Sequence, residues 1–115
     1  MPPVVSFKDS LPSPDSYRPD AEKIVTGDPV QTVANGFSST DGRFNCGVWT
    51  GQVGSWRVSF TENEFCHLLE GKVIVTDTAG DARTFTAGDA FVMPAGFVGT
   101  WEVVEPAKKL YAVYE

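Results

Sequence analysis

The stretch GDAFVMPAGFVGTW, residues 88–101, holds a short apolar run between residues that favour turns. The run AFVMP follows Gly88, and the residues AGFVG separate it from the next apolar run, TWEVV. Glycine adopts backbone conformations that other residues avoid, and proline cannot donate to a strand ladder. The stretch therefore predicts two short strands joined by a glycine-containing turn.

The same alternation of short apolar runs and turn residues continues through the chain from Glu22 onward. No segment shows a sustained helical period, and closing a barrel removes the exposed edges that such short strands would otherwise present. We expect an all-β fold, a single antiparallel jelly-roll barrel of about ten short strands. The predicted strands are EKIVT, VQTV, FNCGVW, SWRVSF, EFCHLLE, KVIVT, ARTFT, AFVMP, TWEVV and KLYAVY.

The length of 115 residues is typical of one domain. Residues 1–21 are rich in Pro, Ser and Asp and predict an irregular arm, with at most a short strand near Val4–Phe7. Residues 22–115 are expected to form the single barrel domain.

Charge and composition exclude several classes of partner. The net charge is −6 and the nine Lys and Arg residues are scattered, so we expect no nucleic-acid partner. The N-terminal residues contain no apolar run long enough for export or for spanning a membrane, which favours a cytoplasmic protein without a membrane partner. Cys46 and Cys66 are then expected to be unbridged small hydrophobes in a reducing compartment.

Alternation along the run SWRVSF assigns its side chains to two faces. Trp56, Val58 and Phe60 share one face, which we expect to point into the barrel, and Arg57 is expected to point outward. In the run EFCHLLE both faces are largely apolar, so periodicity leaves open which one is interior. Its two faces are Glu64, Cys66 and Leu68, and Phe65, His67 and Leu69.

The spacing of Gly51, Glu64 and Gly71 resembles the first sequence motif of the cupin superfamily, a glycine followed by a His-x-His pair, a glutamate and a second glycine. Gly51, Glu64 and Gly71 fit the glycine and glutamate places. The histidine places hold Arg57 and Ser59 in one register, or Val58 and Phe60 in the other. Neither register contains a histidine.

The stretch at residues 88–101 resembles the second cupin motif. Gly88, Pro94 and Gly96 match it, whereas Gly99 replaces the motif histidine and Val103 replaces its asparagine. The resemblance implies a cupin barrel. A cupin metal centre uses imidazoles and one carboxylate, and only the carboxylate of Glu64 remains, so we expect no bound metal and no cofactor.

More closely, the runs EFCHLLEG, FTAGDAFVMPAGFVGTWEV and KKLYAVYE resemble small single-domain members of the ureidoglycine aminohydrolase-like cupin family, from about Gly42 onward. That family includes a manganese-dependent aminohydrolase that acts on ureidoglycine, a cupin linked to ethanolamine utilisation, and short members of unknown activity. The resemblance also implies a homodimer, to which an apolar face containing Phe65, His67 and Leu69 could contribute.

Glu64 is the candidate centre of a functional site. Burial of an unpaired carboxylate is costly, so Glu64 requires a partner. One interpretation is a structural glutamate at the barrel mouth, bonded to backbone amides or an indole. The other is a general acid or base, or an acceptor for an amine or amide of a ligand.

The remaining site candidates lie around Glu64. Cys66 shares its face and is expected to be a buried hydrophobe rather than a nucleophile, because no Lys or His is predicted beside it. Trp101, Phe60 and Val58 are expected to line a ligand pocket with Glu64 and Cys66. Because the places of Glu64 and Gly99 face each other in cupins, the glycine is expected to open space beside the carboxylate. His67 is expected to be a packed or interface residue on the opposite face.

Three functions remain open at this point. The protein could bind a small polar metabolite in the barrel through Glu64, without metal. It could be an enzyme of the aminohydrolase-like type that uses Glu64, with or without an atypical metal. The pocket could also be filled by side chains, so that the surface serves assembly.

Overall fold

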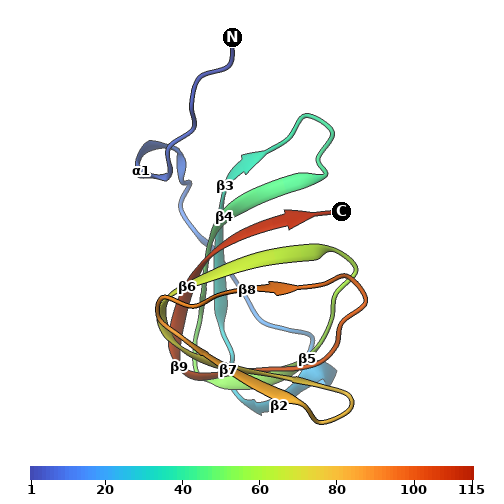
Figure 1. The fold of residues 1–115 in the computed structure, drawn as a ribbon. Coiled ribbons are helices and arrows are strands. Elements are labelled where there is room, and N and C mark those ends of the chain that lie inside the picture. Colours follow the sequence, from blue (N-terminus) through green and yellow to red (C-terminus); the bar gives the residue numbers. More distant parts are fainter.

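The computed structural model describes residues 1–115 and has the expected all-β architecture, a curled antiparallel sheet of the jelly-roll type (Figure 1). Nine strands account for most of the chain, with one four-residue helix and one short 3₁₀ turn. The elements are α1 (Phe7–Ser10), β1 (Asp15–Tyr17), η1 (Ala21–Lys23), β2 (Ile24–Gly27), β3 (Gln31–Ser38), β4 (Phe44–Gly51), β5 (Gly54–Ser59), β6 (Asn63–Asp77), β7 (Ala82–Thr86), β8 (Ala90–Met93) and β9 (Val98–Tyr114).

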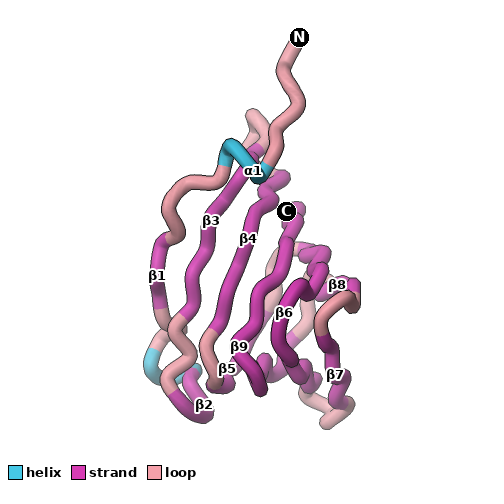
Figure 2. The backbone as a smooth tube through the Cα atoms, turned by 90° about the vertical axis from the view of Figure 1, so that its left-hand side faces the viewer, coloured by secondary structure: helices cyan, strands magenta, loops and turns pink.

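The long strand β9 joins the two sides of the barrel. Its first part pairs with β5 and its second part with β4, while β6 pairs with it along almost its whole length. Strands β1, β3 and β4 lie side by side on one side of β9, and β6, β7 and β8 lie on the other (Figure 2). This arrangement brings the inward face of β9 close to residues of β4, β5 and β6.

Nine strands form instead of the expected ten or so, because two pairs of predicted strands are continuous and one unpredicted strand, β1, is added. EFCHLLE and KVIVT form β6, and TWEVV and KLYAVY form β9. Gly71 bends β6 instead of ending it. Its φ of +88° lies in a region of backbone conformation that glycine adopts and other residues avoid. An added Cβ would also overlap the backbone of Pro106 in β9.

The bend at Gly71 also changes which residues of β6 point inward. Cys66 and Leu68 are buried before the bend, whereas Val73 and Val75 are buried after it. The ladder to β9 is irregular between Leu68 and Val73, so simple alternation does not continue across this region. Because Cys66 and Leu68 are buried, the face that contains Glu64, Cys66 and Leu68 is the interior face of β6 before Gly71.

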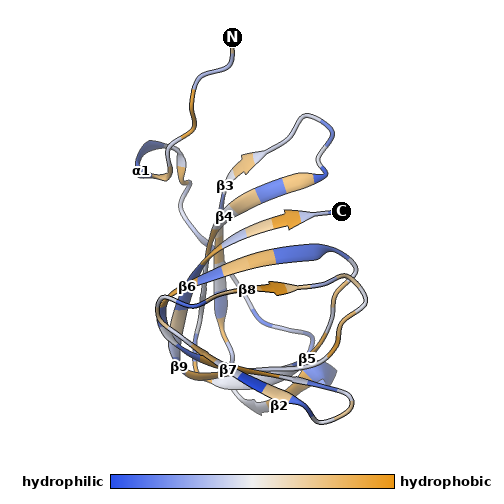
Figure 3. Cartoon of the chain, in the orientation of Figure 1, coloured by the Kyte–Doolittle hydropathy of each residue, from blue (hydrophilic) through white to orange (hydrophobic).

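The core combines residues of β4, β5, β6, β8 and β9. As expected, Trp56 is buried with Val58 and Phe60 packed against the core, while Arg57 is exposed. Hydrophilic and hydrophobic bands alternate along β4 and β6 in Figure 3, as strands with one interior face require. Ten buried residues form the core: Trp49, Trp56, Cys66, Leu68, Val73, Val75, Met93, Trp101, Val103 and Ala107.

The N-terminal segment differs from the expectation in its details. No strand forms at Val4–Phe7; Phe7 instead begins α1, which the Ser6 side chain caps through the backbone N–H of Lys8. A short strand that the sequence did not predict, β1, pairs with β3. The N-terminus itself extends away from the barrel (Figure 1). The division into an arm of residues 1–21 and a barrel of residues 22–115 stays a prediction.

None of the helical segments has the length and hydropathy that crossing a membrane requires.

Candidate functional site

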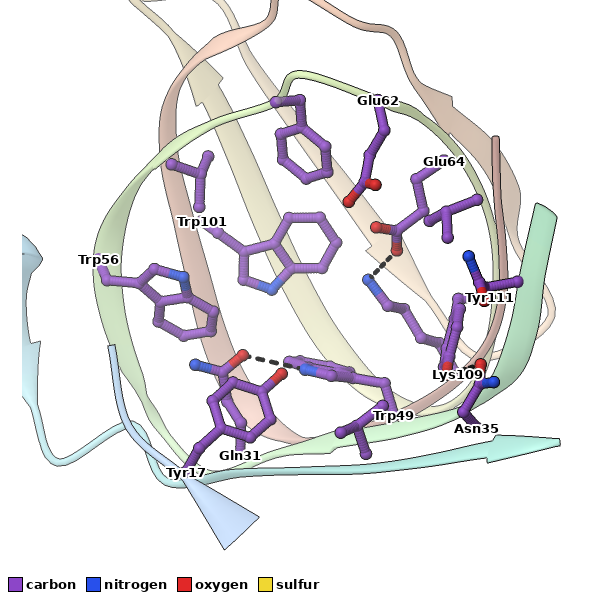
Figure 4. A pocket seen from close by; sticks show the side chains of 15 residues that line it. Tyr17, Gln31, Asn35, Trp49, Trp56, Glu62, Glu64, Trp101, Lys109 and Tyr111 are labelled. Atoms are coloured by element: carbon purple, nitrogen blue, oxygen red, sulfur yellow. Dashed lines mark hydrogen bonds and ion pairs between the residues drawn. The ribbon is translucent and has the colours of Figure 1, made fainter. Parts of the chain in front are cut away.

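A cavity of about 350 Å³ lies inside the barrel and is partly open to solvent. Its wall combines aromatic and aliphatic side chains with a small set of polar groups, an arrangement typical of small-molecule sites (Figure 4). The tryptophans Trp49, Trp56 and Trp101 belong to both the core and the cavity wall. The cavity is therefore bounded in part by the hydrophobic core.

An ion pair between Glu64 and Lys109 occupies one side of this cavity. The Lys109 Nζ lies 2.7 Å from Oε2 of Glu64, and the two side chains are only 7% and 13% exposed, respectively. Lys109 belongs to β9 and pairs in register with Leu68 of β6, so its long stem must run along the strands to reach Glu64. Lys109 is therefore the partner that a buried Glu64 requires and that the sequence alone did not identify.

Two tryptophan rings surround the ammonium group of Lys109. Its Nζ lies 4.4 Å from the centroid of the Trp101 ring and 4.7 Å from that of Trp49. Burial opposes the charge, but the acidic groups of Cys66 and Glu64 outweigh burial and raise the pKa of Lys109 above its usual value. Since the Cys66 thiol is neutral at physiological pH, the Glu64 carboxylate is the charge that keeps Lys109 protonated. Lys109 is thus a buried cation held by the Glu64 carboxylate and by the faces of two tryptophan rings.

Cys66 lies one pleat deeper than Glu64 on the same strand. Its Sγ is 3.2 Å from Oε2 of Glu64, and the residue is fully buried. Burial raises the pKa of the thiol to about 12, so the thiol is protonated at neutral pH. The expected role as a buried hydrophobe fits this geometry. Cys66 is not among the residues that line the cavity, and its expected contact with a ligand stays a prediction.

The other predicted pocket residues are brought together as expected. Glu64, Trp101, Phe60 and Val58 all line the cavity. Whether they bind a ligand stays a prediction.

Gly99 does not open space beside Glu64, which corrects the expectation from the cupin motif. It pairs with Val58 and Asp77, and a Cβ added to it would overlap the carbonyl oxygen of Thr76. The residue is absent from the cavity wall. Glycine is needed here because the backbones of β6 and β9 approach each other closely, which is a packing reason and not a binding one.

His67 lies on the outer face of β6, opposite Glu64, as alternation predicts. It is half-buried and lies between Ala90 of β8 and Leu110 of β9. Its expected interface role stays a prediction.

Some polar groups of the cavity wall form hydrogen bonds within the protein, and others have no partner there. Trp49 donates from Nε1 to Oε1 of Gln31 at 3.0 Å, and the Tyr111 hydroxyl donates to Oδ1 of Asn35 at 2.8 Å. Trp101 is only 2% exposed, and its Nε1 has no hydrogen-bond partner. Buried indole N–H groups are normally bonded, so this donor distinguishes Trp101 from Trp49, whose Nε1 is bonded to Gln31.

Comparison with known proteins places this barrel in a family. The sequence profile of the EutQ-like cupin domain matches residues 38–111, which include most of the strands that form the cavity. The chain belongs to the EutQ-like cupin family.

Solved structures similar to this EutQ-like cupin include three bacterial proteins. A Pseudomonas syringae protein of unknown function aligns with a TM-score of 0.81 at 24% identity, over 95% of this chain and 46% of its own. A Thermotoga maritima DUF861 protein is 36% identical over 56% of this chain and 73% of its own, with a TM-score of 0.54. A putative ethanolamine utilization protein Q from Salmonella typhimurium aligns with a TM-score of 0.68 at 17% identity, over 97% of this chain and 98% of its own.

The EutQ-like cupin spans about half the length of the Pseudomonas syringae protein, and no functionally curated protein matches it. The cupin fold and the EutQ-like domain are shown, whereas the closer resemblance to the ureidoglycine aminohydrolase-like family stays a prediction.

The side chains of this EutQ-like cupin do not fit the metal centre that cupins commonly carry. Nowhere do three His, Cys, Asp or Glu side chains lie close enough to hold a metal ion. Oε2 of Glu64, the only residue at a motif ligand place that could bind a metal, already accepts from the ammonium of Lys109. A single engaged carboxylate is not a transition-metal site.

Sequence reasoning missed several residues of the cavity wall, four of which carry ionisable side chains. Lys109 and Tyr111 share the inward face of β9, and a lysine on an otherwise apolar strand face was the available signal. Glu62 precedes β6 in a turn, where no periodicity assigns a direction. Tyr17 enters the wall from β1, the strand that the sequence did not predict.

Proposed function

We propose that the cavity binds a small polar molecule without a metal ion. The observation that carries this proposal is Trp101, a residue of the wall of an open cavity whose buried Nε1 has no hydrogen-bond partner. Leaving a buried donor unsatisfied costs about 1–3 kcal/mol, and a ligand that accepts from Trp101 would recover this cost.

The arrangement of Lys109 and Glu64 supports the same proposal. Because the two groups neutralise each other, the cavity carries a strong local dipole without an exposed cation. A cavity of about 350 Å³ lies within the range of small-molecule sites. The walls of Trp56, Val58 and Phe60 supply apolar contact, and the few polar groups would orient the ligand.

Co-purification and a ligand panel test this function. Both experiments use buffer that contains EDTA. We expect native mass spectrometry of protein purified without dialysis to show a bound small molecule. Alternatively, we expect at least one member of a metabolite panel that includes ethanolamine to raise the melting temperature. Trp101→Phe should reduce the bound fraction or the affinity about fivefold or more through loss of one hydrogen bond. Phe60→Leu is the control, because it removes aromatic surface from the same cavity without removing a hydrogen-bond donor. No bound molecule and no response to the panel would contradict the proposal.

An enzyme of the aminohydrolase-like type is the second candidate, and Glu62 favours it. Burial and the neighbouring carboxylates of Glu115 and Glu64 raise the pKa of Glu62 above its usual value. A carboxyl group with a raised pKa beside a cavity suits general acid or base chemistry on an amide or amine. Glu64, which the sequence favoured for this role, is engaged by Lys109.

We also propose that the protein forms a homodimer through the outer face of β6. The 48%-exposed Phe65 lies in register between Ala112 and the 58%-exposed Val92. In a two-fold dimer each substitution acts twice, so Phe65→Glu should produce a monomer. Light scattering at micromolar concentration measures this, with the exposed Glu105→Gln as a control for altered charge. A monomeric wild-type protein would refute the homodimer.

A further inference from the structure

The cavity carries different chemistry on its two sides. In Figure 4 the carboxylates of Glu62 and Glu64 lie on one side, Gln31 and Tyr17 lie on the other, and the Trp101 ring lies between them. A ligand that spans the cavity therefore meets acceptors at one end and donors at the other.

Glu62 is the carboxylate that remains available for a cation. Glu64 is paired with Lys109, whereas Glu62 takes part in no ion pair of the protein. Two carboxylates and one ammonium group, those of Glu62, Glu64 and Lys109, leave one net negative charge in the wall. The repulsion that Glu62 receives from Glu64 and Glu115 would be relieved by a positively charged group beside it.

The opposite side offers neutral donors. Trp101 Nε1 has no partner, and Gln31 uses its Oε1 to accept from Trp49, which leaves its NH₂ group free of that bond. Gln31 and Trp101 are both more than nine-tenths buried, so their positions are held by packing. These donors fit a carbonyl or hydroxyl oxygen. A ligand carboxylate would be less favourable, because the wall already carries net negative charge.

Building on the small-molecule function proposed above, we infer that the ligand is a small primary amine that carries a neutral oxygen acceptor. Its ammonium group lies against Glu62, and its carbonyl or hydroxyl oxygen accepts from Trp101 Nε1. The aromatic wall between these two points contacts the carbon skeleton of the ligand.

Three probes built on one skeleton test this charge pattern. Leucinamide carries an ammonium group and a neutral carbonyl, leucine carries an additional carboxylate, and N-acetylleucinamide lacks the ammonium group. We expect isothermal titration calorimetry at pH 7.5 and low salt to show about tenfold or greater preference for leucinamide over either of the other two. Equal or tighter binding of leucine or N-acetylleucinamide would overturn the inference.

Two variants test which side chain contacts each end of the ligand. Glu62→Gln should weaken leucinamide binding about tenfold and leave N-acetylleucinamide unchanged, whereas Trp101→Phe should weaken both. Glu105→Gln, an exposed carboxylate outside the cavity, controls for overall charge. If Glu62→Gln leaves leucinamide binding unchanged, the assignment of the cation to Glu62 is wrong.

The outcomes separate this inference from the proposed function. If the amines fail but anionic or neutral metabolites of the wider panel bind in the cavity and respond to Trp101→Phe, the ligand class is wrong and the binding function stands. If no molecule of any charge binds, both are refuted.

Discussion

Lys109→Met is expected to lower the free energy of unfolding by about 3 kcal/mol, because it leaves the Glu64 carboxylate inside the barrel without its cation. Both side chains are nearly buried, so water replaces the lost ammonium incompletely. The methionine also loses the contact of the ammonium with the Trp49 and Trp101 rings. Urea unfolding measures the change, and the melting temperature should fall by roughly 10–15 °C.

The double variant Lys109→Met/Glu64→Gln separates the ion pair from the packing of the lysine stem. Removing both charges leaves no unpaired ion, so the double variant should be more stable than Lys109→Met alone. Glu64→Gln alone, which leaves Lys109 without its carboxylate, should also be destabilised. If the two single effects simply add in the double variant, Glu64 and Lys109 do not depend on each other and the ion pair is energetically unimportant.

Gly99→Ala is expected to destabilise the protein by about 3 kcal/mol, although it adds only one methyl group. The new Cβ would overlap the carbonyl oxygen of Thr76, and two paired strands must separate to admit it. Gly80→Ala is the comparison, because it introduces backbone strain without a steric overlap. Gly80 has a φ of +90° but open space around it, so its substitution should cost only about 1–2 kcal/mol.

The same geometry predicts the outcome of restoring the motif histidine. Gly99→His should destabilise the barrel at least as much as Gly99→Ala and should not create a manganese-binding protein, since Glu64 stays engaged by Lys109. Elemental analysis after incubation with Mn²⁺ measures this. Stoichiometric manganese in Gly99→His, lost on Glu64→Gln, would show that Gly99 does face the carboxylate.

Local sequence pattern was sufficient for the β class and for the faces of regular strands. Alternation in SWRVSF placed Trp56, Val58 and Phe60 inward, because a strand without irregularity turns every second side chain to the same face. The glycine and proline spacing around residues 88–101 marked turns, since these residues set the backbone dihedral angles locally. The predicted cavity contacts of Glu64 and Trp101 followed from the cupin motifs.

The chemistry of the cavity depended on contacts that local pattern does not contain. The irregular ladder at Gly71 shifts the inward face of β6 between Leu68 and Val73, so the interior face could not be followed through the strand by counting. Glu64 and Lys109 meet only because β6 and β9 pair, and residues distant in sequence are brought together by long-range register. Whether Trp101 Nε1 finds a partner likewise depends on every group packed around it. Turn residues and strand period are properties of neighbouring residues and were readable in the sequence, whereas charge pairing and donor satisfaction arise from strands that approach through space and were decided by the tertiary structure.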